Sequence, residues 1–204
     1  MKKITFLGLA LIAGLGFQSC SNLAQTETDE TATSIQNGTF LADLTTSTVT
    51  YKGVMLGVKE HTGNVPLSNA EFTLTNGAIT GGNFTVDLSS ITPTDSAYDE
   101  NSTREKLVSH LSSPDFFNIA EFPMATFEIT ATEGNTVTGN LTIRGITNQE
   151  TVKDVEVHIV GDVTAIKGNL TFNREKYDVS FDVPMKDMVI SDDIDLSINL
   201  VAAQ

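Results

Sequence analysis

The chain has 204 residues, with 12 lysines and arginines against 26 aspartates and glutamates, which gives a formal net charge of −14 at pH 7. This excess of acid disfavours nucleic acids and anionic lipid head groups as partners, because both reward clusters of basic side chains. Cys20 is the one cysteine, so the chain cannot form an internal disulfide.

The first 19 residues are organised as a secretory signal peptide. Two basic residues, Lys2 and Lys3, precede an apolar run over residues 4–17. This run is shorter than the roughly 20 residues that a membrane-spanning helix needs. A small residue, Ser19, follows it and stands directly before Cys20. We therefore expect cleavage before Cys20 and export of the mature protein.

Residues 17–20 resemble a bacterial lipobox, in which the cysteine becomes the lipidated first residue of the mature protein. Phe17 departs from that motif, since an aliphatic residue is usual there. The resemblance implies lipidation of Cys20 and a membrane-anchored lipoprotein that faces the periplasm or the cell surface. Two or more acyl chains hold a protein stably at a membrane, whereas one anchors it marginally.

Residues 20–37 are interpreted as the lipidated cysteine and a flexible tether. The segment 21–37 is mostly Thr, Glu, Asp, Gln, Asn and Ser, without hydrophobic periodicity. Such a segment cannot bury enough apolar surface to offset the entropy cost of ordering it. Its r.m.s. reach is about 23 Å. Residues 38–204 remain as one domain, large enough for a sizeable core.

The domain is predicted to consist of β-strands almost throughout. Apolar and polar residues alternate with a period of two, which puts apolar side chains on one face of each strand. Turn signals such as Thr75-Asn76-Gly77 and Glu133-Gly134-Asn135 separate the strands. The alternating stretches in chain order are Phe72–Leu74, Phe84–Leu88, Phe127–Ile129, Val137–Ile143, Val155–Ile159, Ile166–Phe172 and Ile194–Leu200.

One segment, from about Ser102 to Phe117, is predicted to be a short helical excursion. Ser102-Thr103-Arg104-Glu105 is a capping-box sequence, and apolar residues follow it with helical spacing. A second turn is expected to begin at Ser113-Pro114. Seven or eight strands with this excursion must hide one long apolar face, and a barrel does so while removing sheet edges.

Several stretches resemble the YceI-like family, in the order that this family uses, over about Gly38–Leu200. They are Val49–Gly53, Lys59–Gly63, Gly81–Ile91, His110–Asn118, Glu121–Phe127, Val137–Thr147 and Phe172–Tyr177. Two positions depart from the pattern, since a tryptophan is common where Tyr51 stands and a glycine where Asp178 stands.

The resemblance implies an all-β fold: an extended, eight-stranded, antiparallel, lipocalin-like barrel with an elongated internal channel and a short helical excursion. Family members with known ligands hold isoprenoid chains such as those of quinones, and none is established as an enzyme. The expected function is therefore to bind a long isoprenoid-type lipid in the cell envelope, for carriage or sequestration, without a cofactor.

Apolar side chains on the inward strand faces are the candidates to contact the lipid. Periodicity by itself favours a packed core for them, whereas the family resemblance favours a lipid channel. Gly139 and Gly168 interrupt the inward faces, and we expect them to leave room for a ligand. The candidates are Phe84, Val86, Phe127, Ile129, Leu141, Ile143, Leu170 and Phe172.

Three further residues are candidates for lipid binding, each with a structural alternative. Phe117 belongs to an aromatic cluster that either covers the channel mouth or pins the helix to the barrel. His61 either lies near a polar head group or is a satisfied turn histidine. Arg174 either hydrogen-bonds a head group or pairs with a neighbouring carboxylate.

The sequence indicates neither a metal site nor a catalytic one. The three histidines lack the spacing of ligand pairs and no cysteine assists them. No Gly-x-Ser-x-Gly motif is present. Asp95, Asp99 and Glu100 could supply paired acids, but we expect them in a solvated loop.

Three functions remain open. A lipid carrier requires a continuous apolar channel. An envelope interaction or stress protein without ligand requires a filled core, with large residues at every inward position. An enzyme acting on a lipid requires a base with an orienting partner.

Overall fold

The structure is a computed structural model that describes residues 37–56, 59–180 and 189–203. The predicted signal peptide (residues 1–19), Cys20 and the predicted tether up to residue 36 lie outside the described residues. Within them, no helix is long and apolar enough to cross a membrane.

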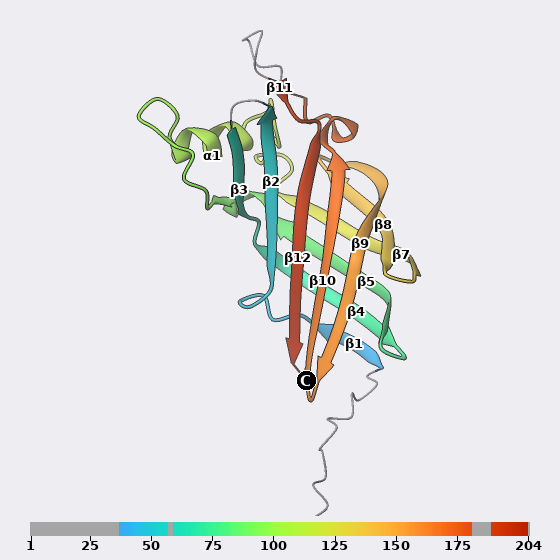
Figure 1. Ribbon diagram of the computed structural model, residues 1–204. Helices are drawn as coiled ribbons and strands as arrows, with labels where there is room; N and C mark the ends of the chain where they lie inside the picture. Colours follow the sequence, from blue (N-terminus) through green and yellow to red (C-terminus); the bar gives the residue numbers. More distant parts are fainter. Residues whose placement is uncertain (1–36, 57–58, 181–188, 204) are drawn as a thin grey trace, which may run out of the picture. The chain divides into compact units, whose positions relative to one another are not determined.

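Strands dominate these described parts of the chain, and one α-helix and two short 3-10 helices interrupt them there (Figure 1). The strands are β1 (Gly38–Leu41), β2 (Thr48–Leu56), β3 (Lys59–Asn64), β4 (Leu67–Thr75), β5 (Ala78–Asp87), β6 (Thr92–Pro93), β7 (Met124–Glu133), β8 (Thr136–Ile143), β9 (Ile146–Val160), β10 (Val163–Asn173), β11 (Val189–Ile190) and β12 (Asp193–Ala203). The helices are α1 (Arg104–Ser112), η1 (Leu88–Ser90) and η2 (Arg174–Tyr177).

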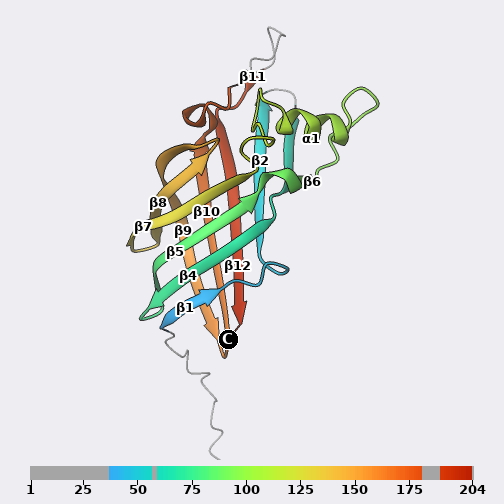
Figure 2. The same cartoon turned by 180° about the vertical axis from the view of Figure 1, so that it is seen from behind.

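All described strands belong to one antiparallel sheet that curls into a half-barrel (Figures 1 and 2). Their order is β1-β4-β5-β7-β8-β9-β10-β12-β2-β3-β6, with β11 paired to β2. Strand β9 pairs with β8 up to Val152 and with β10 from Lys153 on. Asp154 has a positive φ of 52°, and such an irregularity bends a strand, so β9 serves two differently oriented parts of the sheet.

Two further bends carry the chain across the sheet. Between β3 and β4, the Val65 N–H donates to the Val49 carbonyl of β2 (2.8 Å), and the chain then pairs with β5. After β1, the Asp43 N–H donates to the Val201 carbonyl of β12 (2.7 Å), far along the strand order. These crossings draw one edge of the sheet toward its middle and enclose the inner face.

The predicted all-β class is confirmed, but the described residues form twelve strands rather than eight. Bends account for part of the difference, since β3 and β4 are separated by Val65 and Pro66 alone. Strands β6 and β11 also add to the strand number, although each is only two residues long. The predicted alternation is present, most clearly in β8 and β10, where every second residue is buried.

The helical excursion is shorter than predicted. Helix α1 begins at Arg104 and its N-cap is Thr103, whose hydroxyl accepts a hydrogen bond from the Lys106 N–H (3.3 Å). The sequence had placed the cap one residue earlier, because Ser102 also fits the capping pattern. The helix ends at Ser112, and turns rather than a second helical segment follow it.

Candidate binding cavity

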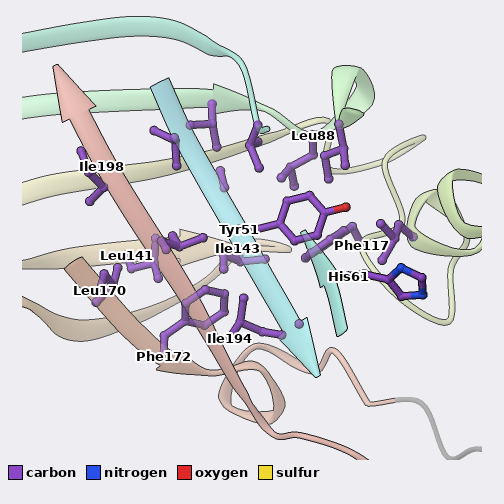
Figure 3. Close-up of a pocket in the computed structure, with 18 of the residues that line it drawn as sticks. Tyr51, His61, Leu88, Phe117, Leu141, Ile143, Leu170, Phe172, Ile194 and Ile198 are labelled. Atoms are coloured by element: carbon purple, nitrogen blue, oxygen red, sulfur yellow. The ribbon is translucent and has the colours of Figure 1, made fainter. Parts of the chain in front are cut away.

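An apolar cavity of about 450 Å³ lies within the curled sheet (Figure 3). This volume falls in the range of about 300–1,000 Å³ that small-molecule sites occupy. Strands β2, β5, β7, β8, β10 and β12 form most of its wall, and residues of α1 and of the loop before it line one end.

The eight apolar residues predicted from strand alternation all line this cavity. They are Phe84, Val86, Phe127, Ile129, Leu141, Ile143, Leu170 and Phe172. His61 and Phe117 line it as well. Strand β12 contributes Ile194, Leu196, Ile198 and Leu200, which alternate in the sequence but were not among the predicted lining residues. That these residues contact a lipid stays a prediction.

Many lining side chains keep part of their apolar surface uncovered. Leu141, Ile143, Leu170 and Phe172 are buried. In contrast, Phe84, Val86, Phe127, Ile129, Ile194, Leu196 and Ile198 are half-buried, although they pack against the core. A completely filled core would cover such side chains on all sides, as protein interiors are close-packed. The uncovered surface therefore belongs to a space that an apolar ligand can fill.

The expectation that Gly139 and Gly168 leave room is wrong. A Cβ atom on Gly139 would lie 2.5 Å from the Glu128 carbonyl oxygen and 2.7 Å from Cε1 of Phe127. A Cβ atom on Gly168 would lie 2.7 Å from Cγ1 of Val152. Neighbouring atoms therefore take up the space over both glycines, although Gly168 still lines the cavity.

A different glycine does border open space. Gly53 of β2 lines the cavity, and a Cβ atom there would meet Cδ1 of Ile194 at 3.6 Å, an ordinary van der Waals distance. No other atom lies within 4 Å of that position among the described residues, apart from the chain neighbours of Gly53. A larger side chain at Gly53 would therefore project into the cavity.

The polar lining residues gather mainly at the α1 end of the cavity. They include Lys59, His61, Lys106 and His110, together with residues 101–103. No aspartate or glutamate of the described residues lines the cavity, although the chain has 26 of them. The arrangement suits an elongated ligand with a long apolar part and one polar end.

His61 is on strand β3, not in a turn, and it pairs with Asp95. Its Nδ1 lies 3.3 Å from both carboxylate oxygens of Asp95. The same carboxylate accepts hydrogen bonds from the N–H groups of Thr62 (3.1 Å) and Ala97 (2.9 Å) and from the Tyr98 hydroxyl (2.9 Å). Asp95 is thus bound on several sides, which corrects the expectation of a solvated loop acid.

Burial and hydrogen bonding act on Asp95 in opposite directions. Burial raises the pKa of its carboxyl, but the hydrogen bonds from Ala97, Tyr98, Thr62 and His61 outweigh burial and hold the pKa below the usual value. The carboxylate is therefore charged at neutral pH. A charged carboxylate can only accept hydrogen bonds, so the contact between Asp95 and the His61 Nδ1 is one in which the imidazole N–H donates.

Tyr98 fastens the loop before α1 to this pair. The Tyr98 ring stacks on the His61 ring at a centroid distance of 5.4 Å. The Arg104 guanidinium lies over the Tyr98 ring, 5.1 Å from its centroid. Burial, followed by the hydrogen bond to Asp95, raises the pKa of Tyr98 to about 12. On β3, the Lys59 ammonium donates to the Ser102 hydroxyl (2.8 Å). These contacts hold the polar end of the cavity together.

Phe116 and Phe117 both line the cavity, and a role of Phe117 as a cover of the channel mouth stays a prediction. Phe116 is buried and meets Phe117 edge-on at 5.0 Å, while the Arg144 guanidinium donates to the Phe116 carbonyl (2.6 Å). Phe116 thus pins the segment after α1 to the β8–β9 turn. Phe117 is half-buried and points into the cavity beside α1 (Figure 3).

Arg174 does not line the cavity, so its place among the candidate binding residues is corrected. Its guanidinium is buried and donates to the carbonyls of Val179 (2.6 Å) and Ser191 (3.1 Å) and to the Asp192 carboxylate (3.0 Å). The structural alternative, pairing with a neighbouring carboxylate, is the observed one. Arg174 joins the segments on either side of residues 181–188.

Within the described residues, no group of three or more His, Cys, Asp or Glu side chains is arranged to hold a metal ion. His158 is exposed and pairs with Glu156 at 3.1 Å. Tyr51 is a further lining residue that the sequence did not single out. Its hydroxyl is buried, and the only signal in the sequence was its departure from the tryptophan common in the family.

Sequence comparisons identify relatives of this domain. The model of the YceI-like domain matches residues 40–202. Two UPF0312 proteins of Staphylococcus aureus, from strains bovine RF122 / ET3-1 and N315, are 47% identical over 79 residues and 42% identical over 88 residues. The alignments cover 35% and 40% of this chain and 46% and 51% of theirs. The chain thus spans about half the length of the curated relatives it matches.

Two solved structures share the fold. Burkholderia cenocepacia BcnA superposes with a TM-score of 0.64 at 24% identity, covering 79% of this chain and 99% of that one. A polyisoprenoid binding domain from Saccharophagus degradans, implicated in plant cell wall breakdown, superposes with a TM-score of 0.55 at 14% identity, covering 82% and 99%. At these identities the likeness is one of fold.

Proposed function

The chain belongs to the YceI-like family, and from that premise we propose that its cavity binds one long apolar lipid chain of the isoprenoid type. The observation that carries the proposal is the apolar wall whose side chains, Phe84, Phe127 and Ile198 among them, are half-buried around a cavity of about 450 Å³. The description of the Saccharophagus degradans neighbour as a polyisoprenoid binding domain supports the ligand class.

The energetics of an apolar wall favour carriage or sequestration over permanent storage. Moving one five-carbon isoprene unit out of water into such a cavity is favourable by roughly 3–4 kcal/mol, at about 0.8 kcal/mol per carbon. Moving the same unit out of a bilayer gains almost nothing, because lipid tails are equally apolar. The cavity therefore takes up a chain from a membrane, and returns it, at little cost in free energy.

We place this function in the cell envelope. The support comes from the signal-like residues 1–19 and the lipobox-like residues 17–20, with Cys20 as the lipidated residue. In this proposal the mature protein is exported and held at a membrane through Cys20, facing the periplasm or the cell surface. It then binds a lipid that comes from the same membrane.

A binding function is favoured over catalysis. His61 and Asp95 resemble the base and orienting carboxylate of a hydrolase. However, within the described residues the side-chain hydrogen bonds of His61 go to Asp95, and no serine hydroxyl donates to it. Without a nucleophile next to the base, the pair lacks the group that would form a covalent intermediate. The contacts of His61 and Asp95 instead indicate a structural role, in which the pair fixes the loop before α1 to strand β3.

Mass spectrometry of an organic extract from the natively purified mature domain tests the proposal. A stoichiometric isoprenoid in the extract is the expected result. The same domain, stripped of lipid, should then bind a long-chain isoprenoid and should not hydrolyse lipid esters or phosphates. An extract without lipid, together with no uptake by the stripped domain, would favour the envelope interaction or stress protein without ligand. Hydrolysis that disappears in His61→Ala would favour the enzyme.

A further inference from the structure

The hydroxyl of Tyr51 is the one buried side-chain nitrogen or oxygen among the described residues that has no hydrogen-bond partner. Burying a hydroxyl without a partner is unfavourable, and native structures rarely leave such groups unpaired unless another molecule satisfies them. Tyr51 also lines the cavity, so a ligand in the cavity can supply the missing acceptor.

The fold holds this ring in one place. Tyr51 of β2 is paired with Gly63 of β3, and Gly63 is paired in turn with Pro93 of β6. The ring covers Gly63 closely, since a Cβ atom there would lie 2.6 Å from Cε1 of Tyr51 and 2.8 Å from Cα of Pro93. The absence of a side chain at position 63 thus makes room for the ring, and the hydroxyl has a fixed direction.

That direction is toward the polar end of the cavity. In Figure 3 the Tyr51 hydroxyl points toward the side where Phe117 and His61 lie, beside α1. The other polar groups of this end have partners. Lys59 donates to the Ala97 carbonyl and the Ser102 hydroxyl, and Lys106 donates to the Asn101 carbonyl (3.0 Å).

The charges around Tyr51 favour a neutral partner. Burial raises the pKa of Tyr51 strongly, and the nearby Tyr98 and Asp95 raise it further, so the hydroxyl stays protonated and donates. The Asp95 carboxylate would repel an anionic oxygen at the same place, and its influence on Tyr51 is larger than the opposite influence of the Arg104 guanidinium. The ammonium groups of Lys59 and Lys106, which line this end of the cavity, would attract an anion, and for that reason the test below includes a phosphate. A neutral carbonyl oxygen accepts the hydrogen bond without that repulsion.

We propose that the Tyr51 hydroxyl donates a hydrogen bond to a neutral carbonyl-type oxygen on the polar end of the bound lipid, and that Tyr51 thereby selects carbonyl-bearing isoprenoids over isoprenoid hydrocarbons. The inference rests on the proposed function, since it assigns a specificity residue to the cavity that holds the apolar chain. It concerns the polar end alone, and the apolar wall binds either kind of lipid.

The test compares wild type with Tyr51→Phe on three lipids. They are geranylgeranylacetone, the hydrocarbon with a methylene in place of its carbonyl, and geranylgeranyl phosphate. Affinities come from displacement of a fluorescent lipid. Tyr51→Phe should weaken binding of the ketone by about 3- to 10-fold, the effect of one net hydrogen bond. It should leave binding of the hydrocarbon unchanged. The difference between these two changes in affinity reports the hydrogen bond of the hydroxyl, because a change in packing would affect both lipids alike.

Tyr177→Phe is the matched control. Tyr177 is fully buried outside the cavity lining, and its hydroxyl donates to the Glu150 carboxylate (3.2 Å). This control should lower the melting temperature and leave all three affinities as in wild type. Tyr51→Phe should keep or raise the melting temperature of the ligand-free protein, because it removes an unpaired buried hydroxyl.

The outcomes separate the inference from the function on which it rests. Equal affinities of wild type and Tyr51→Phe for the ketone, with wild type binding both neutral lipids, would overturn the inference and leave the proposed function standing. Tightest binding of the phosphate, unaffected by Tyr51→Phe, would also overturn it, in favour of Lys59 and Lys106 as the recognition groups. Binding of none of the three lipids by wild type would overturn both.

Discussion

The carboxylate of Asp95 receives hydrogen bonds from β3, through His61 and the Thr62 N–H, and from its own loop, through Ala97 and Tyr98. At the scale of single residues, this group joins the loop before α1 to the sheet. The donors are not interchangeable with water, because Asp95 is largely buried, with 11% of its side chain exposed. Removing the carboxylate leaves several donors without an acceptor.

Asp95→Ala is therefore expected to lower the free energy of unfolding by about 1–3 kcal/mol at pH 7, the usual penalty for orphaned buried donors. The folded-state pKa of Asp95 is depressed, so its contribution is present above its unfolded pKa of about 4 and is lost as pH falls through the folded pKa. Urea unfolding of both proteins at several pH values measures this. A stability difference that persists unchanged at the lowest pH would contradict it.

At the scale of strands, glycines in the inner wall have two different roles. Gly139 of β8 lies under the Phe127 ring of the neighbouring β7, whereas Gly53 of β2 borders the cavity. The difference lies in what the adjacent strand places over each glycine.

Gly139→Ala should consequently destabilise the protein by about 1–3 kcal/mol through overpacking against Phe127. Gly53→Ala is the matched control and should be neutral or slightly stabilising, because alanine has fewer conformations than glycine in the unfolded chain. Thermal unfolding of the two variants checks the pair. Equal effects of both substitutions would show that the glycines do not differ in this way.

Strand alternation was sufficient to identify much of the cavity wall. The period of two fixes which side chains share a face, and residues such as Phe84, Leu141 and Phe172 therefore fall on the inner one. Alternation does not show whether a glycine on that face opens a space or is covered, which depends on the neighbouring strand. Gly168 and Gly53 both line the cavity, but Val152 of the adjacent strand takes up the space over Gly168 and leaves that over Gly53 open.

Contacts between residues far apart in the chain could not be predicted from the sequence either. His61 and Asp95 are 34 positions apart, and the register of β3 brings them together. The sequence did not decide whether Arg174 binds a lipid head group or has a structural role, because its carbonyl partners, Val179 and Ser191, become neighbours only when the chain folds. The number of strands was underestimated, since periodicity does not reveal bends such as that at Val65 and Pro66.

At the scale of the whole molecule, the proposed function needs both a membrane anchor and a lipid cavity. The anchor is a prediction from residues 17–20 alone. Cys20→Ala should leave the protein without acyl chains and move it from washed membranes to the soluble fraction, as judged by fractionation and by mass of the mature N-terminus. Cys20→Ala that remains with the membranes would contradict a lipid anchor. Because the cavity lies in residues 38–203, the same variant should still bind isoprenoid.

The central claim is that the space inside the curled sheet is a lipid site and not a gap in a core. Gly53→Leu tests it most directly, because this side chain projects into the cavity next to Ile194 without a close contact at its Cβ. Uptake of a long-chain isoprenoid and the melting temperature of the lipid-free protein should be measured together for wild type and Gly53→Leu. We expect wild type to bind the lipid, and Gly53→Leu to lose binding while keeping its melting temperature. Undiminished binding by a stably folded Gly53→Leu, or no binding by wild type, would contradict a lipid site in this cavity.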